Sequence, residues 1–215
     1  MNRLLTLRLD ENWRRRAAGA CLEGRPTRVL DLCTGTGDLA LRLARSFHPP
    51  AVIAGLDFSP TMLALARKKA GESVRRGVAF IEGDAVALPF GERTFDAVGI
   101  AFGFRNLTYR NPIKDRALGE VLRILRPGGR FVIVETSQPR NRIFRGLVHA
   151  YLGVMAGRIG GLLSGHPEAY RYLARSAIHY YSPDELLAVL KDAGFAEARH
   201  TPLFGGVAGL TVAVK

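Results

Sequence analysis

Val29-Leu-Asp-Leu-Cys-Thr-Gly-Thr-Gly-Asp38 is the stretch of this 215-residue chain that decides its fold. Its apolar first half is typical of a buried strand, and its two glycines mark a tight turn that leads into a helix. Such a turn brings backbone N–H groups, with no Cβ in the way, against a bound ligand. The stretch therefore predicts a strand, a glycine turn and a helix that form one wall of a ligand site.

The acidic residue inside this strand points to one kind of ligand. Asp31 lies four residues before Gly35, where a turn built only for phosphates has little use for a carboxylate. A carboxylate suits a ligand with a positively charged amino-acid group, and this favours S-adenosylmethionine. The run from Gly35 through Gly37 to Ala40 also fits the G-x-G-x-x-A pattern of dinucleotide-binding turns. The turn alone therefore leaves a dinucleotide open as the alternative.

Strand-like and helix-like stretches alternate along most of the chain. The sequence predicts strands at 27–33, 51–57, 78–82, 95–101 and 130–135. It predicts helices at 38–47, 60–70 and 114–126, and a last helix that begins at the capping box 182–185 and ends at Gly194. Continuous apolar strands that alternate with helices indicate a doubly wound, mostly parallel α/β sheet covered on both faces.

The end of the chain departs from this parallel pattern. Two further strands are predicted at 196–203 and 207–214, and the link between them is too short for a helical crossover. They are therefore expected to pair antiparallel. A Rossmann-like sheet with an antiparallel C-terminal strand is the arrangement of class I methyltransferases. We expect residues 1–215 to form a single domain of this kind.

Between Glu135 and Ser182 lie 46 residues, far more than a loop needs. Residues 139–181 hold six arginines and one acidic residue, and 146–165 is almost wholly apolar. The central Arg158 argues against a membrane span, because a charge at the bilayer centre is costly. We interpret 136–181 as a helical cap insert over a substrate pocket, with an extra structural helix pair as the alternative.

The formal net charge of +12 suggests an anionic neighbour, either a nucleic acid or an anionic membrane surface. The basic residues are spread along the whole chain, so a merely solvated basic surface is the alternative. Two cysteines, Cys21 and Cys33, provide no framework of disulfides or metal ligands, and we expect no metal. With no signal peptide visible, a cytoplasmic location is expected.

Two further sites follow along the predicted carboxyl edge of the sheet. Asp57 closes the second strand and is placed to accept both ribose hydroxyls of a nucleoside, with an N-terminal helix charge as its alternative role. Asp84 and the Ala85 N–H follow the third strand, where they suit an adenine ring; for Asp84 a turn-forming role is the alternative. Together with 88–90 and 95–96, these residues favour the methyl donor over a dinucleotide.

Three motifs outside this site point to a known family, and the first and the last of them are much more distinctive than the general methyltransferase core. They are Phe102-Gly-Phe-Arg-Asn106, Val121-Leu-Arg-Ile-Leu-Arg-Pro-Gly-Gly129 and Glu168-Ala-Tyr-Arg-Tyr-Leu173. On these motifs the chain resembles the demethylmenaquinone and polyprenyl-benzoquinol C-methyltransferases, over essentially its whole length. The resemblance implies methyl transfer from S-adenosylmethionine to a ring carbon of demethylmenaquinol in menaquinone biosynthesis, with a benzoquinol of ubiquinone biosynthesis as the alternative.

The resemblance also assigns donor contacts, residue by residue. The family's donor-binding positions fall on Thr36, Asp57, Asp84 and Ala85. A further contact, often serine in the family, falls on Ala101, so a side-chain hydrogen bond is missing there. The family normally has a longer N-terminal arm; a start codon assigned too late is our preferred explanation, and a missing part of the lid is the other.

Catalysis by such an enzyme consists mostly of positioning and of excluding water. Arg105 is the candidate that stabilises the phenolate oxygen of the quinol, with a structural salt bridge as its alternative role. Tyr170 and His166 are the candidate proton acceptors in the cap, and His166 has a turn as its alternative. The basic, apolar cap suits an isoprenoid tail taken from an anionic membrane surface by a peripherally bound protein.

Two other classes of protein compete with this interpretation. A nucleic-acid methyltransferase would usually show an added binding domain or an Asn/Asp-Pro-Pro-Tyr type motif, and neither is visible, so no nucleic-acid partner is expected. A non-catalytic quinone- or lipid-binding protein of the same fold would keep Asp57 but need no Arg105. The expected partner is an isoprenoid quinol, and a homodimer stays open.

Overall fold

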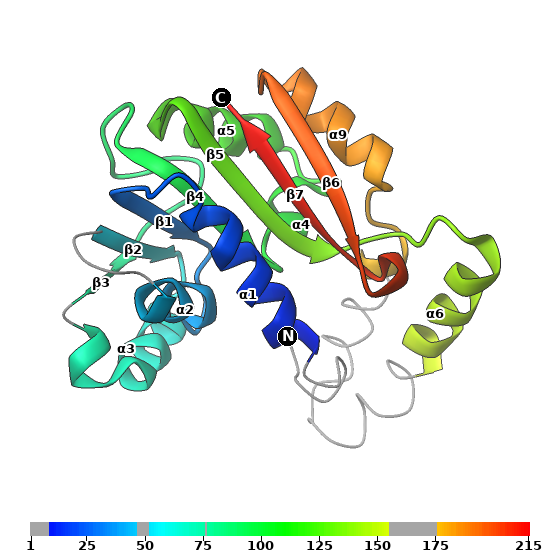
Figure 1. The fold of residues 1–215 in the computed structure, drawn as a ribbon, viewed down its shortest axis with the longest axis horizontal. Helices are drawn as coiled ribbons and strands as arrows, with labels where there is room; N and C mark the ends of the chain where they lie inside the picture. The colour runs from blue at the N-terminus through cyan, green and yellow to red at the C-terminus, as the bar shows by residue number, and fades with distance from the viewer. Residues whose placement is uncertain (1–8, 47–51, 76, 155–175) are drawn as a thin grey trace.

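The structure is a computed structural model that describes residues 9–46, 52–75, 77–154 and 176–215. Within these ranges, seven strands form one sheet in the order β3-β2-β1-β4-β5-β7-β6 (Figure 1). The strands are β1 (Arg28–Leu32), β2 (Val52–Asp57), β3 (Val78–Glu82), β4 (Phe95–Ala101), β5 (Leu125–Thr136), β6 (Glu197–Leu203) and β7 (Ala208–Val214). Strands β1 to β5 are parallel, and β7 is antiparallel to both β5 and β6, which confirms the predicted fold class.

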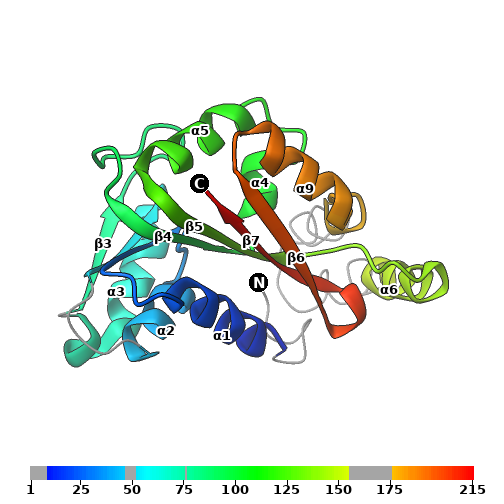
Figure 2. The same cartoon turned by 45° about the horizontal axis from the view of Figure 1, so that its top comes forward.

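Helices cover both faces of the sheet (Figure 2). One face carries α1 (Leu9–Leu22), α2 (Asp38–Ser46) and α3 (Pro60–Arg75). The other carries α4 (Phe104–Thr108), α5 (Lys114–Ile124) and α9 (Pro183–Asp192). Each face has its own apolar core, because the side chains of these parallel strands alternate between two covered surfaces.

The helix α1 is not predicted by the sequence pattern. Trp13, Ala17 and Cys21 recur every four residues and are buried, so one narrow stripe of the helix faces the sheet. The approach is close: a Cβ on Gly99 of β4 would lie 2.9 Å from Cys21 Sγ. Glycine at this position therefore lets α1 lie directly on the central strands.

The junction between α5 and β5 also differs from the prediction. The helix ends at Ile124 rather than at residue 126, because Leu125 is extended and pairs with Phe95 of β4. The register then shifts between Phe95 and Ala97. The segment Pro127-Gly128-Gly129 consequently lies inside β5, as an irregularity near its start, and not between a helix and a strand.

The predicted cap insert is described in part. After β5, the helix α6 (Arg142–Val154) follows, whereas residues 155–175 lie outside the described residues. Gln138 Nε2 donates to the carbonyl oxygens of Ala177 and Ile178, both at 2.9 Å, so the two ends of the insert are tied together. Among the helices that the structure describes, none is long and apolar enough to cross a membrane. The domain boundaries stay a prediction.

A methyl group added at Gly99 tests the packing of α1 on the sheet. Gly99→Ala should lower the free energy of unfolding by about 1–3 kcal/mol, since the new Cβ would lie 2.9 Å from Cys21 Sγ and 3.0 Å from Leu39 Cδ2. Gly99→Ala/Cys21→Ala should recover part of this loss in urea unfolding. The control Gly119→Ala lies on the exposed side of α5 and should be slightly stabilising. Equal losses in the two glycine variants would contradict this packing.

Candidate functional site

The loops after β1 and β4 meet at the middle of the carboxyl edge of the sheet. The strand order runs from β1 to β2 and β3 on one side, and from β4 to β5 on the other. A Cβ on Gly103, after β4, would lie 2.8 Å from the Cβ of Cys33, after β1. Cys33 and Phe102 both have left-handed φ angles, of 54° and 60°, which are costly for residues with a side chain. Open α/β sheets bind their ligands at such a point.

The turn after β1 depends on two glycines with different roles. Gly37 has a φ of 77°, and a Cβ there would lie 3.1 Å from both Ala66 Cβ and the Phe80 ring, so it serves the packing of the turn. Gly35 has a φ of 54°, and its Cβ position has no atom within 4 Å. The turn is therefore packed beneath Gly37 and open at Gly35, where a ligand can approach the backbone.

Asp57 connects the end of β2 to this turn. Its Oδ2 accepts a hydrogen bond from the Gly35 amide at 2.7 Å, and its Oδ1 accepts one from the Ser59 amide at 3.0 Å. The side chain is almost fully buried. A carboxylate has about four lone-pair sites, so this arrangement fixes its orientation and leaves capacity for further donors.

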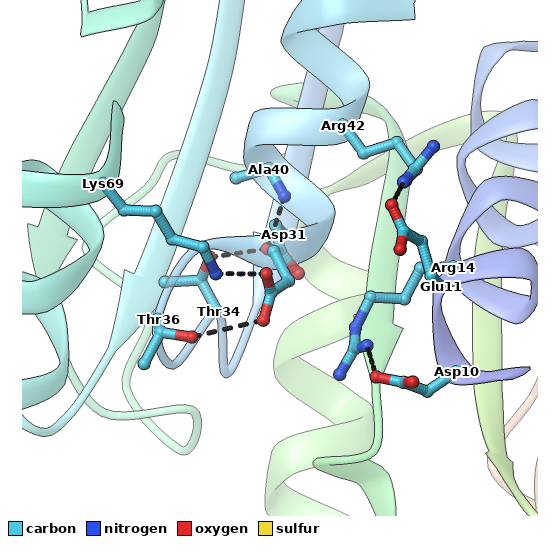
Figure 3. A network of polar contacts seen from close by, with 10 residues as sticks. Asp10, Glu11, Arg14, Asp31, Thr34, Thr36, Ala40, Arg42 and Lys69 are labelled. Atoms are coloured by element: carbon cyan, nitrogen blue, oxygen red, sulfur yellow. Dashed lines mark hydrogen bonds and ion pairs between the residues drawn. The ribbon is translucent and has the colours of Figure 1, made fainter. Parts of the chain in front are cut away.

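Asp31 is buried beneath the turn (Figure 3). Its Oδ2 accepts hydrogen bonds from the Thr34 hydroxyl at 2.5 Å and from the Ala40 amide at 2.9 Å. Burial raises the pKa of Asp31 to about 7, while these hydrogen bonds and the charge of Arg14 act against the rise. The carboxylate braces the turn against the first residues of α2. That it also faces the amino group of a donor stays a prediction.

Thr36, a predicted donor contact, lies in the glycine turn, two residues before α2 begins. Its hydroxyl donates to Asp38 Oδ2 at 3.2 Å, and Lys69 from α3 pairs with Asp38 Oδ1 (Figure 3). Burial acts to raise the pKa of Asp38, but the hydrogen bond and charge of Lys69 outweigh it and hold the pKa below its ordinary value. This ion pair ties α3 to the turn.

The segment after β3 forms a tight turn beside Asp57. The Gly83 amide donates to the Asp57 carbonyl at 3.1 Å, and Asp84 Oδ1 accepts from the Val86 amide at 3.1 Å. Asp84 therefore does form a turn, which was its alternative role, and this leaves donor binding as a prediction. Ala85 is buried next to it. The carboxyl ends of β2 and β3 thus bring Asp57 and Asp84 to one edge.

Ala101 ends β4 and is half-buried there. The amide of the next residue, Phe102, donates to the Val134 carbonyl at 2.8 Å, so the loop continues along β5. The Phe102 ring contacts α1: its centroid lies 6.1 Å from that of Trp13, and the Arg14 guanidinium lies 5.0 Å above it. One side of the site is therefore formed by α1, which carries Trp13 and Arg14.

Arg105 lies on α4 and is almost fully buried, together with Glu135 at the end of β5. Its Nη1 donates to Thr136 Oγ1 at 3.0 Å and lies 3.8 Å from Glu135 Oε1. Its backbone amide donates to Glu135 Oε2 at 3.2 Å. The alternative role of Arg105, an internal salt bridge, is thus present in the structure. A buried pair of this kind contributes little net stability, since desolvation offsets the attraction.

One polar atom of this pair, Arg105 Nε, is buried without a hydrogen-bond partner among the described residues. The buried hydroxyl group of Tyr180 feels the charges of both members of the pair and has Thr108 as its hydrogen-bonding neighbour. Burial raises the pKa of Tyr180 well above its ordinary value, and the charge of Glu135 adds to the rise. Tyr180 therefore remains protonated and can only act as a neutral hydroxyl. Orphaned buried polar atoms are rare in folded proteins and call for an explanation.

Two of the predicted catalytic residues, Tyr170 and His166, lie outside the described residues, so their roles stay predictions. Glu135 and Tyr180 are site residues that the sequence patterns did not identify. For Glu135 a signal existed, because it is an acidic residue that follows an apolar strand, as Asp57 does. Among the described residues, no group of three or more histidine, cysteine, aspartate or glutamate side chains could hold a metal ion.

Known proteins resemble the chain over its full length. A model of the ubiE/COQ5 methyltransferase family matches residues 1–215. The demethylmenaquinone methyltransferase of Thermus thermophilus is 46% identical over 212 residues, which are 99% of this chain and 93% of that protein. The ubiquinone/menaquinone biosynthesis C-methyltransferase UbiE of Geobacter sulfurreducens is 40% identical over 216 residues, covering 100% of this chain and 82% of its own. A solved SAM-dependent methyltransferase from Aquifex aeolicus shares the fold, with a TM-score of 0.62, 20% identity, and coverage of 87% and 81% of the two chains.

The raised pKa of Asp31 predicts a pH-dependent stability. The folded chain binds this proton more tightly than the unfolded chain, whose pKa is near 3.8. The stabilisation is therefore complete below about pH 4 and is lost as the pH rises through about 7. Asp31→Asn keeps an acceptor for Thr34 and Ala40 but carries no charge, so its free energy of unfolding should lack this decline in urea titrations. If the free energy of unfolding depended on pH in the same way in the wild type and in Asp31→Asn, Asp31 would not be a buried carboxyl group that binds a proton in the folded chain.

Proposed function

The chain belongs to the ubiE/COQ5 methyltransferase family, and we propose that it methylates a ring carbon of demethylmenaquinol in menaquinone biosynthesis. It is a C-methyltransferase, and its methyl donor is S-adenosylmethionine. The full-length match to a demethylmenaquinone methyltransferase carries the proposal. A benzoquinol of ubiquinone biosynthesis is the second candidate acceptor, because relatives named UbiE carry both quinones in their names.

We assign the amino-acid end of the donor to Asp31, Gly35, Thr36 and Gly37. The fit is supported by Gly35, whose Cβ position is free of protein atoms within 4 Å. We assign the ribose to Asp57, because its carboxylate is already oriented by two backbone amides and can accept hydroxyl donors as well. When bound, S-adenosylmethionine supplies the electrophilic methyl group.

The adenine end of the donor is assigned to the neighbouring strand ends. Asp84 suits the exocyclic amine, and the Ala85 amide suits a ring nitrogen. Ala101, at the end of β4, can offer only its methyl group, since it replaces a hydroxyl that the family often has there. This assignment is supported by the direct connection between the ends of β2 and β3, because the Gly83 amide donates a hydrogen bond to the Asp57 carbonyl oxygen at 3.1 Å.

The acceptor side is assigned to Arg105. Loss of a phenolic proton leaves electron density on the adjacent ring carbon of the quinol, and a fixed cation stabilises the phenolate oxygen. The Nε of Arg105, which has no hydrogen-bond partner among the described residues, is a donor that this oxygen would satisfy. Tyr170 and His166 remain the proposed proton acceptors. The buried surroundings exclude water from the charged intermediate.

The location of the acceptor bears on the location of the protein. An isoprenoid quinol is held in the membrane by its tail, so we propose a cytoplasmic protein that contacts the inner, anionic surface of the membrane. The net charge of +12 favours such contact. We propose that the protein has no nucleic-acid partner. We also propose a homodimer, and a measurement of the oligomeric state in solution tests it.

Asp57 provides a direct test of the donor site. Asp57→Asn should weaken the binding of S-adenosylmethionine by about tenfold or more in calorimetric titration, because a charged acceptor for the ribose hydroxyls is lost. Asp96→Asn is the matched control: its carboxylate bonds the Thr27 and Arg28 amides at the opposite, amino end of the strands. Undiminished donor affinity in Asp57→Asn would refute the assigned ribose contact.

Arg105 is tested by separating its structural role from catalysis. Arg105→Met should destabilise the fold by roughly 3–5 kcal/mol, because it leaves the buried Glu135 carboxylate unpaired. Arg105→Met/Glu135→Gln should recover most of this stability, and it should bind the donor normally yet transfer no labelled methyl group to a demethylmenaquinol analogue. Methyl transfer by the double variant at the wild-type rate would show that Arg105 has only the structural role of forming the salt bridge.

A further inference from the structure

The helix α6 presents an apolar stripe to the outside of the molecule. Ile143, Leu147, Tyr151 and Val154 are 78%, 65%, 46% and 53% exposed. Their spacing of four, four and three residues puts them on one face of the helix. Single exposed apolar residues are ordinary, whereas a row of large ones on one helix face indicates an interaction surface.

Other side chains of α6 fix the helix to the body of the protein. Phe144 packs against the connection between β6 and β7, since a Cβ on Gly205 would lie 2.7 Å from Phe144 Cε1. His149 Nε2 is hydrogen-bonded to Gln138 Oε1 at 2.8 Å, and Gln138 in turn holds two carbonyl groups on the far side of the insert. These contacts determine which face of α6 points outward.

A further exposed aromatic residue lies next to this helix. Phe204 begins the short turn η2 (Phe204–Gly206) and is 60% exposed. Its neighbour Gly205 lies against Phe144 of α6, and both views of the fold show the turn between β6 and β7 facing α6 (Figures 1 and 2). We call the stripe together with Phe204 the α6 patch.

The charged residues of the helix α6 itself are all basic. The helix contains Arg142 and Arg145 and no acidic residue. Arg142 is exposed, and the side chain of Arg140, just before the helix, is 81% exposed and has one solvent-exposed ion pair, with Asp184 at 3.4 Å. An exposed apolar stripe beside arginines is typical of helices that lie in the headgroup region of a membrane.

The α6 patch also lies close along the chain to the assigned acceptor site. The helix begins six residues after Thr136, which ends β5 and bonds Arg105 at the assigned acceptor site. A surface that holds α6 would therefore lie near the edge of the sheet where the quinol ring must arrive.

We propose that the α6 patch inserts into the surface of an anionic lipid bilayer, with Arg140 and Arg142 at the phosphate headgroups. The patch thereby holds the acceptor site against the membrane, a consequence that rests on the proposed quinol methylation. The binding itself does not depend on that function. Its occupant is a lipid surface because the patch combines large apolar side chains with exposed arginines, of which Arg140 has only a solvent-exposed ion pair.

Flotation with lipid vesicles tests the apolar part of this surface. The wild-type chain should bind vesicles of phosphatidylglycerol and phosphatidylcholine, and Leu147→Ser should bind about tenfold more weakly. Leu65→Ser is the matched control, an exposed leucine on α3, and should bind as the wild type does. Equal vesicle binding by the two serine variants would overturn the proposal, as would a failure of the wild type to bind.

The charged part has its own prediction. Arg142→Gln should weaken binding to these vesicles about fivefold, because each basic residue near an anionic surface contributes on the order of a factor of five. Pure phosphatidylcholine vesicles should bind all variants weakly. If light scattering instead showed a dimer that Leu147→Ser dissociates, with no vesicle binding by the wild type, the patch would be a contact between two copies and the proposal would be wrong.

A pair of substrates separates this proposal from the proposed function. Leu147→Ser should methylate a tailless demethylmenaquinol analogue at the wild-type rate and a long-tailed quinol in vesicles more slowly. If the wild type methylated neither substrate but still bound vesicles, the proposed quinol methylation would be refuted. The proposed membrane contact of the α6 patch would not be affected. Equal rates of Leu147→Ser and wild type on the vesicle-bound quinol would show that the α6 patch does not serve substrate access.

Discussion

The parallel register of β1, β2, β4 and β5 is the constraint on which the site depends. In this register Asp31 lies between Gly55 of β2 and Gly99 of β4, and the carboxyl ends of the strands meet at one edge. The glycine neighbours leave room for the helices and the turn to pack closely above the strands. Donor and acceptor groups, which come from sequence positions far apart, are thereby brought within reach of one another.

The same edge gathers several carboxyl groups that the protein keeps away from water. Asp31 and Asp57 are held by backbone amides, and Glu135 is held by the amide and guanidinium of Arg105. Burial of these groups makes the fold less stable than it would be with apolar side chains at this edge. Their orientation is fixed in return, so little reorganisation is needed when a sulfonium cation or a phenolate approaches.

Local signals predicted much of this fold, and long-range contacts account for what they missed. The bounds of β3 and β4 and the capping box at Ser182 agree with the predictions, because apolar runs and cap residues act within a few positions. The helix α1 was missed, since its buried stripe of Trp13 and small residues is masked by Arg14-Arg15-Arg16. The family motif identified Arg105, but its partner Glu135 is 30 residues away and only the fold brings the two together.

The chemical identity of the methylated product tests the account most directly. The purified chain would be given S-adenosylmethionine with an isotope-labelled methyl group and a reduced demethylmenaquinone analogue, and the product would be analysed by nuclear magnetic resonance. The account predicts that the label appears as a methyl group bonded to a ring carbon of the quinone. Donor binding without any label in the quinone, or a label bonded to a ring oxygen, would contradict it.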